Sequence, residues 1–282
     1  MLLSGLSQYE ELGFSLDYVT PQKDYLLHTH DFSELEIILS GTAVNSINGK
    51  SFSVEAGDVF VVEQGATHEI TQVRGLTLYN IGFRQSALRS LGADLLELPG
   101  FHALFLSRPE LDPGVRQLHL KEEELNKVRH LLEEMRQEYL GGEPGFRTAL
   151  LCGFSRLLLM LSRNYSQQTP TGGIWQAAAA AARMEREFGE EMSVRGLAES
   201  VYLSERHFRR LFEKVYGVSP SDYLLELRLR TAGRLLISES ASVTEVAMAC
   251  GFSDGNYFSR VFRRKYGMPP TAYRALRGKN QT

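Results

Sequence analysis

Two stretches near the C-terminal end of the sequence decide the fold: "YLSERHFRRLFEKVYGVSP" at residues 202–220 and "GFSDGNYFSRVFRRKYGMPP" at residues 251–270. They are nearly the same phrase, about fifty residues apart, with one extra residue in the second copy. A shorter helical stretch precedes each copy, and a brief turn separates it from the longer one. This layout predicts two helix-turn-helix units, at 194–217 and 243–267.

The ends of the longer helices are marked by residues that favour helix termini. A serine side chain accepts a hydrogen bond from the free N–H groups of a first turn, so Ser204 and Ser253 are the expected N-caps. Glycine adopts the left-handed conformation that closes a helix, so Gly217 and Gly267 are the expected C-caps. The two copies therefore predict second helices with the same kind of start and end.

Each second helix has an apolar stripe and a basic face. Phe208 and Phe212 mark the stripe in the first copy, and Phe258 and Phe262 mark it in the second. A polar face is usually only solvated, but here arginines recur over the same core in both copies. Arginine and asparagine pair bidentately with guanine and adenine edges in the major groove. The repeat therefore predicts two recognition helices set about one turn of DNA apart.

The distribution of charge supports this interpretation. The whole chain carries a net charge of −3, but the stretch from Gly172 to the end has 17 Lys and Arg against 12 Asp and Glu, a net charge of +5. The preceding part carries a net charge of −8. An acidic front and a basic back indicate two domains with different partners, and the basic one is the candidate for binding a polyanion.

The last hundred residues resemble the DNA-binding domain of AraC/XylS-type bacterial transcription regulators. The motifs "LAESVYLSERHFRRLFEKVYGVSP" and "VAMACGFSDGNYFSRVFRRKYGMPPTAYR" carry the resemblance. It implies that both recognition helices contact DNA. Together with two arginines on the same polar face, the predicted contact residues are Arg206, Arg209, Arg210, Asp254, Asn256, Tyr257, Arg260, Arg263 and Arg264. Arg210 and Arg260 recur at the same place in both copies, so they are as well suited to bracing the helices or holding phosphates as to contacting bases.

Residues 15–84 have the pattern of short strands. Apolar residues alternate or form short runs, and turn signals such as Asn48-Gly49 separate them. Many short strands at close intervals predict a sandwich or a small barrel. The segment 85–120 is expected to be irregular, because Pro99 and two further prolines interrupt it.

The hydrophobic period then changes to that of helices. In residues 121–140 and 146–165, apolar residues step by three and four, and a short Gly/Pro loop joins the two stretches. Two helices joined in this way should pack antiparallel. The polar stretch "SQQTPTGG" that follows has the composition of a linker.

Histidines form the densest motif of the front half. In "HTHDFSELEIILSG", His28 and His30 are two apart on a strand, so both point to one face, and Glu34 follows. The later stretch "GDVFVVEQGATHEITQ" supplies His68. The spacing H-x-H-x3-E-x6-G, then G-x5-E-x-G-x2-H, resembles the two cupin motifs. The second motif departs from the usual pattern, with glutamate for proline and glutamine for asparagine.

This resemblance implies two alternative uses for the histidines. In metal-dependent cupins the matching positions hold a divalent ion, and three imidazoles with a carboxylate suit zinc, manganese, iron or nickel. In regulators the histidines can instead be hydrogen-bonded pocket residues. The candidate metal ligands are His28, His30, Glu34 and His68, and the candidate ligand-binding residues are the same four with Tyr79 and Asn80. Three nearby acids are expected to be surface charges or partners of the histidines: Asp31, Glu36 and Glu63.

The expected fold is α+β, with four parts. Residues 1–115 form a cupin β-barrel or jelly roll that senses a ligand. Residues 116–165 form a helical hairpin that either mediates dimerisation or only covers the barrel. Residues 166–174 are a linker, and residues 175–282 are an all-α DNA-binding domain with two helix-turn-helix units.

Three further features bound the class of protein. Cys152 and Cys250 are far apart in apolar helical contexts, which predicts buried, reduced thiols. No window approaches the roughly 18 apolar residues of a membrane span. The N-terminus lacks the basic start of a signal peptide. These features indicate a cytoplasmic protein without a membrane partner.

The sequence therefore predicts a ligand-responsive transcription regulator of the AraC type, not an enzyme. Its front domain is similar to that of the sugar-responsive members, most of all the rhamnose-responsive activators, which implies an activator whose effector is a small sugar or sugar derivative. The expected partners are double-stranded DNA, the effector, RNA polymerase and a second copy of the chain. No cofactor is required, although a divalent metal in the cupin domain remains an alternative. The other function classes are a metal-responsive regulator and a cupin metalloenzyme.

Overall fold

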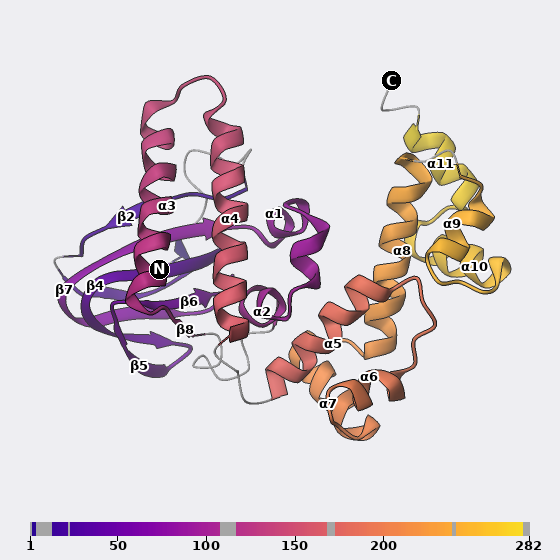
Figure 1. Ribbon diagram of the computed structural model, residues 1–282, viewed down its shortest axis with the longest axis horizontal. Coiled ribbons are helices and arrows are strands. Elements are labelled where there is room, and N and C mark those ends of the chain that lie inside the picture. The colour runs from indigo at the N-terminus through magenta and orange to yellow at the C-terminus, as the bar shows by residue number, and fades with distance from the viewer. Residues whose placement is uncertain are drawn as a thin grey trace. The chain divides into compact units, whose positions relative to one another are not determined.

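The chain is a sheet-containing part followed by a helical part. The computed structural model describes residues 2–3, 13–21, 23–107, 117–167, 173–238 and 241–278. The chain divides into two compact units, Met1–Ala178 and Ala179–Thr282. The described strands belong to the first unit and the second is helical, which confirms the predicted α+β class (Figure 1). Residues 168–172 of the predicted linker lie outside the described residues.

Within the described ranges, the first unit contains an eight-stranded sheet. Its order is β1-β3-β7-β4-β6-β8, with β2 beside β7 and β5 beside β4. The described pairs are antiparallel except for β1 with β3. The strands are β1 (Leu2–Leu3), β2 (Asp17–Val19), β3 (Tyr25–His30), β4 (Ser33–Ile47), β5 (Lys50–Glu55), β6 (Asp58–Val62), β7 (His68–Phe83) and β8 (Leu118–His119).

The two long strands, β4 and β7, pair with each other and connect the remaining strands of the sheet. The first half of β4 also pairs with β6 and its second half with β5, whereas β7 also pairs with β3 and β2. The first half of β4 faces the apolar core through Ile38, and the second half faces it through Ala43 and Ile47. The inward side therefore changes from even to odd residue numbers, because the pairing with β7 shifts register between Ile38 and Val44. A slip of one residue exchanges the two faces of a strand. As a result, both halves of β4 line the same interior.

A glycine is required where β4 bends. Gly41 has a φ of 79°, and a Cβ at this position would lie 2.3 Å from the carbonyl oxygen of Gly75 on β7. The two strands thus approach each other too closely for a side chain. This is the glycine that closes the first cupin-like motif, so the motif specifies a bend of the backbone as well as the polar side chains before it.

The predicted helical hairpin is present in the first unit. Its helices, α3 (Glu122–Gly141) and α4 (Phe146–Gln167), lie side by side next to the sheet (Figure 1). Each has a buried apolar stripe. Phe154 of α4 stacks on Phe14 with ring centroids 4.3 Å apart, and its ring centroid lies 6.5 Å from that of Phe83 on β7. The hairpin therefore covers the face of the sheet that points away from the barrel interior.

The segment predicted to be irregular, 85–120, is helical over most of residues 85–106 and contains the strand β8 near its end, which corrects the prediction for its described part. It forms α1 (Gln85–Ser90), a 3-10 turn (Ala93–Glu97), α2 (Pro99–Phe101) and a π-helical turn (His102–Leu106). Pro99 occupies the start of α2, where proline's missing N–H is no loss and its fixed φ favours a helix. The proline that was expected to break structure therefore begins a helix. Residues 108–116 of the same predicted segment lie outside the described residues.

The second unit contains both predicted helix-turn-helix units. Helix α6 with α7 forms the first and α9 with α10 the second, and α8 connects them. The helices from the end of the hairpin onward are α5 (Gly173–Glu187), α6 (Val194–Ser200), α7 (Glu205–Tyr216), α8 (Pro220–Ser238), α9 (Val243–Ala249), α10 (Gly255–Tyr266) and α11 (Pro270–Gly278). No described helix is both long and apolar enough to cross a membrane.

An aromatic contact is repeated in the two helix-turn-helix copies and shows that the duplication extends to the packing. Each copy packs one phenylalanine against two tyrosines: Phe212, Tyr216 and Tyr223 in the first copy, and Phe262, Tyr266 and Tyr273 in the second. The phenylalanine ring centroid lies 4.6 Å from the first tyrosine ring in one unit and 4.5 Å in the other. It meets the second tyrosine ring edge-on at 5.4 and 5.3 Å. The two recognition helices therefore rest on nearly superimposable cores.

One of the predicted N-caps is wrong. Ser204 caps α7 as expected, but the N-cap of α10 is Asp254, whose side chain accepts from the Asn256 N–H at 2.8 Å. Both helices contain 12 residues and both end at the predicted glycine C-caps. The extra residue of the second copy thus belongs to the turn before the helix, which moves the cap from Ser253 to Asp254.

The prediction for the cysteines is half right. Cys250 is buried where α9 ends, but Cys152 is exposed on α4. Cys152 lies outside the buried stripe of its helix, so its apolar neighbours in sequence point to a different side.

The corrected cap predicts an asymmetry between two adjacent residues. Asp254→Ala should lower the free energy of unfolding of the protein by about 1 kcal/mol, because the first turn of α10 loses its side-chain acceptor. Ser253→Ala should change it much less. Chemical denaturation followed by far-UV circular dichroism measures both. Equal losses, or a larger loss for Ser253→Ala, would contradict the assignment of the cap.

Candidate DNA-binding surface and ligand site

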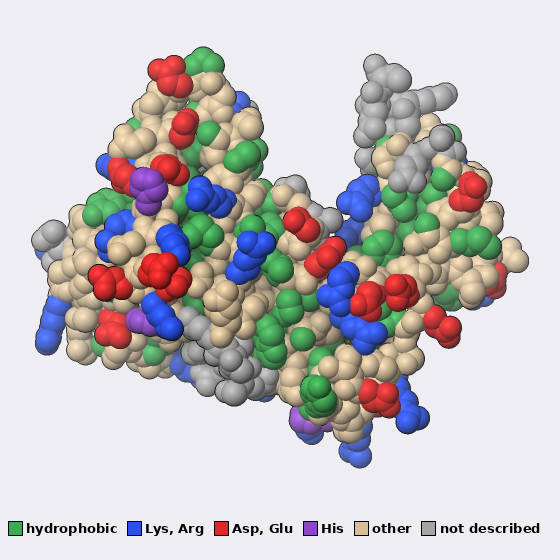
Figure 2. All heavy atoms as spheres, viewed as in Figure 1, with side chains coloured by type: hydrophobic (Ala, Val, Ile, Leu, Met, Phe, Trp, Pro, Cys, Tyr) green, Lys and Arg blue, Asp and Glu red, His purple; other side chains and the backbone are tan. Residues whose placement is uncertain are grey.

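The first recognition helix, α7, presents its arginines away from its core. Phe208 and Phe212 are fully buried, and Arg206, Arg209 and Arg210 are exposed. This separation follows from the helical period, which places residues three and four apart on one face. In Figure 2, Lys and Arg side chains stand out from the surface at the lower end of the second unit, where Figure 1 shows α7.

The second recognition helix, α10, repeats the arrangement. Phe258 and Phe262 are fully buried, and the polar residues between them face solvent. The predicted contact residues from this helix and its cap are all exposed: Asp254, Asn256, Tyr257, Arg260, Arg263 and Arg264. The guanidinium of Arg260 lies 5.5 Å from the ring centre of Tyr257, so the two side chains form one stacked surface.

The predicted contact residues differ in how far other interactions already engage them. Arg209 is ion-paired with Glu205 at 2.8 Å, and Asp254 serves as a helix cap. Among the described residues, five predicted contact residues have side chains with no hydrogen-bond or ion-pair partner: Arg206, Arg210, Asn256, Arg263 and Arg264. Arg206 and Asn256 represent this group, one from each recognition helix, and are free to bind an external partner such as a base edge.

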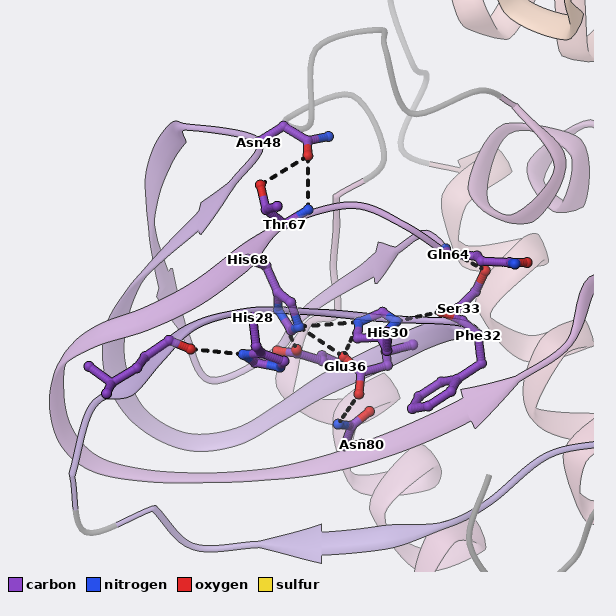
Figure 3. Close-up of polar contacts among 12 residues, drawn as sticks. His28, His30, Phe32, Ser33, Glu36, Asn48, Gln64, Thr67, His68 and Asn80 are labelled. Carbon is purple, nitrogen blue, oxygen red and sulfur yellow. Dashed lines mark hydrogen bonds and ion pairs between the residues drawn. The ribbon is translucent and has the colours of Figure 1, made fainter. Parts of the chain in front are cut away.

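The predicted histidine cluster is assembled inside the barrel from three strands. His28 and His30 lie on β3, and His68 on β7 stands directly opposite His28. Nε2 of His30 lies 2.9 Å from Oε2 of Glu34 on β4, and Nε2 of His68 lies 3.2 Å from the same oxygen. The two Nε2 atoms are 3.2 Å apart (Figure 3). One carboxylate oxygen therefore holds two imidazoles together.

His28 lies at the more exposed side of the cluster. Its Nδ1 is 2.9 Å from the backbone oxygen of Leu26, and its ring centroid is 4.1 Å from that of His68. His28, Glu34 and His68 each offer a ligand atom, and these atoms all lie within 4.8 Å of one another. The donor set fits a borderline metal such as zinc. The same atoms also fit a hydrogen-bonded pocket, because imidazole and carboxylate already pair directly.

Burial and hydrogen bonding shift the pKa values of the two interior carboxyl groups in opposite directions. Burial alone would raise the pKa of Glu34, but hydrogen bonds from His30 and His68 outweigh it and hold that pKa well below its usual range. Burial raises the pKa of Glu36 well above its ordinary value, and the charge of Glu34 adds to the rise. The interior therefore favours an ionised Glu34 beside a carboxyl that resists ionisation.

Of the two β7 residues predicted to bind ligand, the structure brings only Asn80 to the cluster. Its side-chain amide donates to Oε1 of Glu34 at 2.9 Å. Tyr79 points to the opposite face, because adjacent strand residues alternate. Its hydroxyl donates to Oε2 of Glu133 on α3 at 3.1 Å, and its ring meets Tyr18 edge-on at 5.2 Å. Tyr79 thus joins the sheet to the hairpin instead of lining the interior.

Two further interior residues differ in how far the sequence indicated them. Glu36 is only 2% exposed and its Oε1 lies 3.7 Å from Nδ1 of His68, so of the two alternatives given for it, a surface charge or a partner of the histidines, the structure shows the second. Asn45 is fully buried and was not predicted. It faces inward because β4 shifts register around Gly41, and the glycine inside the strand is the local signal for that shift.

The DNA-binding surface and the histidine cluster both lie in regions that match known protein families. The profile of the AraC-like ligand binding domain matches residues 14–139, and that of a helix-turn-helix domain matches residues 197–276. The HTH-type transcriptional activator RhaS of Escherichia coli O139:H28 is 31% identical over 252 residues, which cover 89% of this chain and 87% of that protein. The chain belongs to the AraC family of transcription regulators.

As a member of the AraC family, the chain is a DNA-binding transcription regulator with a ligand-binding domain, and its curated relatives are regulators, not enzymes. Two solved structures resemble part of it. A regulator with an AraC-type DNA-binding domain from Chromobacterium violaceum is 38% identical, covering 36% of this chain and 91% of that one, with a TM-score of 0.35. The DNA-binding domain of AdpA in complex with a target DNA is 37% identical, with the same coverage and TM-score.

The surface of this AraC-family protein predicts which substitutions weaken DNA binding. Arg206→Ala or Asn256→Ala should each cost about 1–3 kcal/mol of binding free energy at a cognate site and relax base choice there. A site selected from a random-sequence pool supplies the DNA, and fluorescence anisotropy measures affinity for it and for its single-base variants. Arg84→Ala, an exposed residue directly after β7 in the other unit, is the control and should leave affinity unchanged. Wild-type affinity and base preference in both variants would contradict the assigned faces.

Proposed function

We propose that this AraC-family protein is a transcription activator that responds to a small sugar or sugar derivative bound inside its barrel. The observation that carries the proposal is the convergence of His30, Glu34, His68 and Asn80 in the interior of the ligand-binding domain. A sugar hydroxyl both donates and accepts hydrogen bonds, so it suits a mixture of carboxylate, imidazole and amide. Similarity to a protein named as a transcriptional activator supports the activating role.

For DNA binding, we propose that each recognition helix lies in one segment of the major groove. Each copy of the chain would bind one half-site with α7 and α10, and a second copy would bind the other half-site, in direct or inverted order. An activator also needs RNA polymerase as a partner. The proposed location is the cytoplasm, where bacterial DNA and polymerase are found.

A metal-responsive regulator is the second candidate, and one observation favours it. The ligand atoms of His28, Glu34 and His68 are close enough together to share an ion. A bound ion would add positive charge between β3, β4 and β7 and would compete with the direct pairing of Glu34 to His30. The cupin metalloenzyme has no such support, since the curated relatives are regulators.

An effector titration separates these candidates. Saturating sugar should change the affinity for the selected DNA site, or the transcription yield with RNA polymerase, by about 5–150-fold, the usual range of coupling between two sites. The panel begins with L-rhamnose, because the front domain resembles that of rhamnose-responsive activators, and continues with other aldoses. All measurements are made first with EDTA present, and then repeated without EDTA and with zinc added. A response to zinc alone, abolished in His28→Ala and His68→Ala, would replace the sugar proposal with the metal one.

We also propose that the α3–α4 hairpin is the dimer interface. Leu140 is 62% exposed and Leu151 is 36% exposed, and both lie on the hairpin. A groove runs between α3 and α4, and Met135 of α3 and Cys152 of α4 line it. Figure 2 shows hydrophobic side chains on the hairpin surface among charged ones. Helices with one stripe on the sheet and further apolar residues outside are suited to packing against a second copy.

The dimer proposal predicts the effect of one charge. Leu151→Glu should convert a dimer into a monomer, because burying an unpaired carboxylate in the interface is costly. Sedimentation velocity at several protein concentrations measures the change. Leu26→Glu is the matched control, since Leu26 is 82% exposed on β3 and should not affect association. A wild-type monomer, or a Leu151→Glu dimer as stable as the wild type, would count against this interface.

A further inference from the structure

The turn of the first helix-turn-helix copy contains a tyrosine in a backbone conformation that favours glycine. Tyr202 has a φ of 59°, which lies in the left-handed region. This conformation is unfavourable for a residue with a side chain, because the Cβ comes too close to the following carbonyl oxygen. Bulky residues are rarely found there, and strained positions of this kind cluster at functional sites. Tyr202 therefore calls for an explanation.

The second copy shows that the turn itself requires this conformation. Gly251 occupies the matching position and has a φ of 77°. The same backbone hydrogen bond closes both turns. In the first copy the N–H of Leu203 donates to the carbonyl of Ala198 at 2.9 Å, and in the second the N–H of Phe252 donates to that of Ala247 at 3.0 Å. Glycine is the residue that such a turn favours, so Tyr202 departs from what the backbone prefers.

Within the described part of the chain, no side-chain interaction of Tyr202 offsets this strain. Tyr202 is 95% exposed, the largest exposed fraction among the large hydrophobic side chains of the described residues. Its side chain has no hydrogen bond and no ring contact within the same residues. An aromatic ring that remains in water gains nothing from burial. The use of Tyr202 is therefore to be sought in a contact with another molecule.

The position of Tyr202 brings DNA within its reach. It lies in the turn that joins α6 to α7 (Figure 1), two residues before the N-cap Ser204 and four before the exposed Arg206. Four residues span at most about 14 Å, and the major groove is about 12 Å wide. In a bound helix-turn-helix the first helix crosses the DNA backbone and the second enters the groove. The turn between them therefore lies beside the phosphates that border the groove.

We propose that the hydroxyl of Tyr202 donates a hydrogen bond to a DNA phosphate at the edge of the groove segment that α7 occupies. The inference rests on the proposed placement of α7 in the major groove, and it adds a residue that fixes the position of this helix along the DNA. Tyrosine is among the side chains that contact phosphate oxygens, and such contacts set register without selecting sequence. Its ring has only two rotatable bonds, so little conformational freedom is lost on binding.

The charges on either side of the turn permit a phosphate to approach. Two exposed acids flank Tyr202 in the sequence, and each is paired with an arginine. Glu199 on α6 is ion-paired with Arg195 at 2.9 Å, and Glu205 on α7 is ion-paired with Arg209 at 2.8 Å. Each pair has a net charge of zero, so a phosphate beside the turn does not meet an uncompensated carboxylate.

The proposed contact belongs to the first copy and has no equivalent in the second. A Cβ at Gly251 would lie 2.8 Å from the guanidinium carbon of Arg228 and 2.8 Å from the carbonyl oxygen of Phe188. The chain itself therefore covers the turn of the second copy, whereas the turn of the first copy is open to solvent at Tyr202. The half of the DNA site that α7 contacts should thus contain one phosphate contact that the half contacted by α10 lacks.

Two substitutions in the full-length protein separate the hydroxyl from the backbone strain. Tyr202→Phe removes only the hydroxyl, so DNA affinity should fall about tenfold, the usual order for a hydrogen bond to a charged group, while the melting temperature stays unchanged. Tyr202→Gly removes the ring and the strain together, so affinity should fall at least as much and the melting temperature should not fall.

Fluorescence anisotropy measures the affinity for a duplex selected from a random-sequence pool with the wild type. Leu276→Ala is the matched control, because Leu276 is another exposed hydrophobic residue of the same unit, 56% exposed on α11, and should leave affinity unchanged. Wild-type affinity in Tyr202→Phe would overturn the proposal.

A neutral contact to a phosphate has further signatures that a structural role of Tyr202 would not produce. It releases no counterion, so the slope of log affinity against log salt concentration should be the same in Tyr202→Phe as in the wild type. The loss of affinity should also be equal on all single-base variants of the site. Single methylphosphonate substitutions in the duplex should identify one position, in the half contacted by α7, that weakens the wild type but not Tyr202→Phe. The lack of such a position, or an altered base preference, would refute the contact.

The outcomes distinguish this inference from the proposed placement of α7. If Arg206→Ala weakens DNA binding and Tyr202→Phe does not, the placement stands and the phosphate contact is wrong. If Tyr202→Phe weakens binding while Arg206→Ala keeps wild-type affinity and base preference, the contact stands and the placement fails. A Tyr202→Phe protein that binds DNA normally but supports less transcription with RNA polymerase would assign the turn to a protein partner and exclude the contact to DNA.

Discussion

The DNA-binding unit depends on one shared helix. α8 begins at Pro220 directly after the first helix-turn-helix unit and carries Tyr223 into the aromatic contact of that unit. Further along, Leu229 and Leu236 enter the core of the second unit. A 19-residue helix is about 28 Å long, the same scale as the 34–36 Å between successive major-groove segments. Because both recognition helices pack on α8, their spacing is a property of a rigid element and not of a loop.

A second kind of contact holds the chain just before each helix-turn-helix copy. An arginine binds the backbone carbonyls at the end of the preceding helix, which otherwise lack partners. Arg228 donates to the carbonyls of Phe188 and Glu190 after α5, and Arg274 donates to those of Leu236 and Ala241 around the end of α8. The arginines stand at different positions of the repeat, because Tyr223 corresponds to Tyr273 and Arg274 therefore corresponds to Leu224. The two halves thus share the kind of contact that holds the end of the preceding helix, but not the residue position that makes it.

The sequence predicted the features that local pattern controls and missed those that depend on strand register. The repeat revealed both recognition helices, but alignment alone does not show on which side of a turn an extra residue falls, so the cap at Asp254 was placed one residue early. The spacing of His28, His30 and Glu34 revealed the cluster, because all three lie before the bend in β4. Asn45 lies beyond the bend, where the inward side changes from even to odd numbers, and simple alternation would place it outside.

Strand β7 connects the interior to the hairpin within a single peptide unit. Asn80 binds Glu34 in the interior, and the adjacent Tyr79 binds Glu133 of α3 on the opposite face. A ligand that shifts the backbone of Asn80 also moves Tyr79, whereas one that only rotates the Asn80 side chain does not. Contiguity alone does not amount to coupling, which requires two arrangements of similar free energy. The hydrogen bonds from Asn80 to Glu34 and from Tyr79 to Glu133 are the two contacts that would have to differ between such arrangements, because they lie on opposite faces of the same strand.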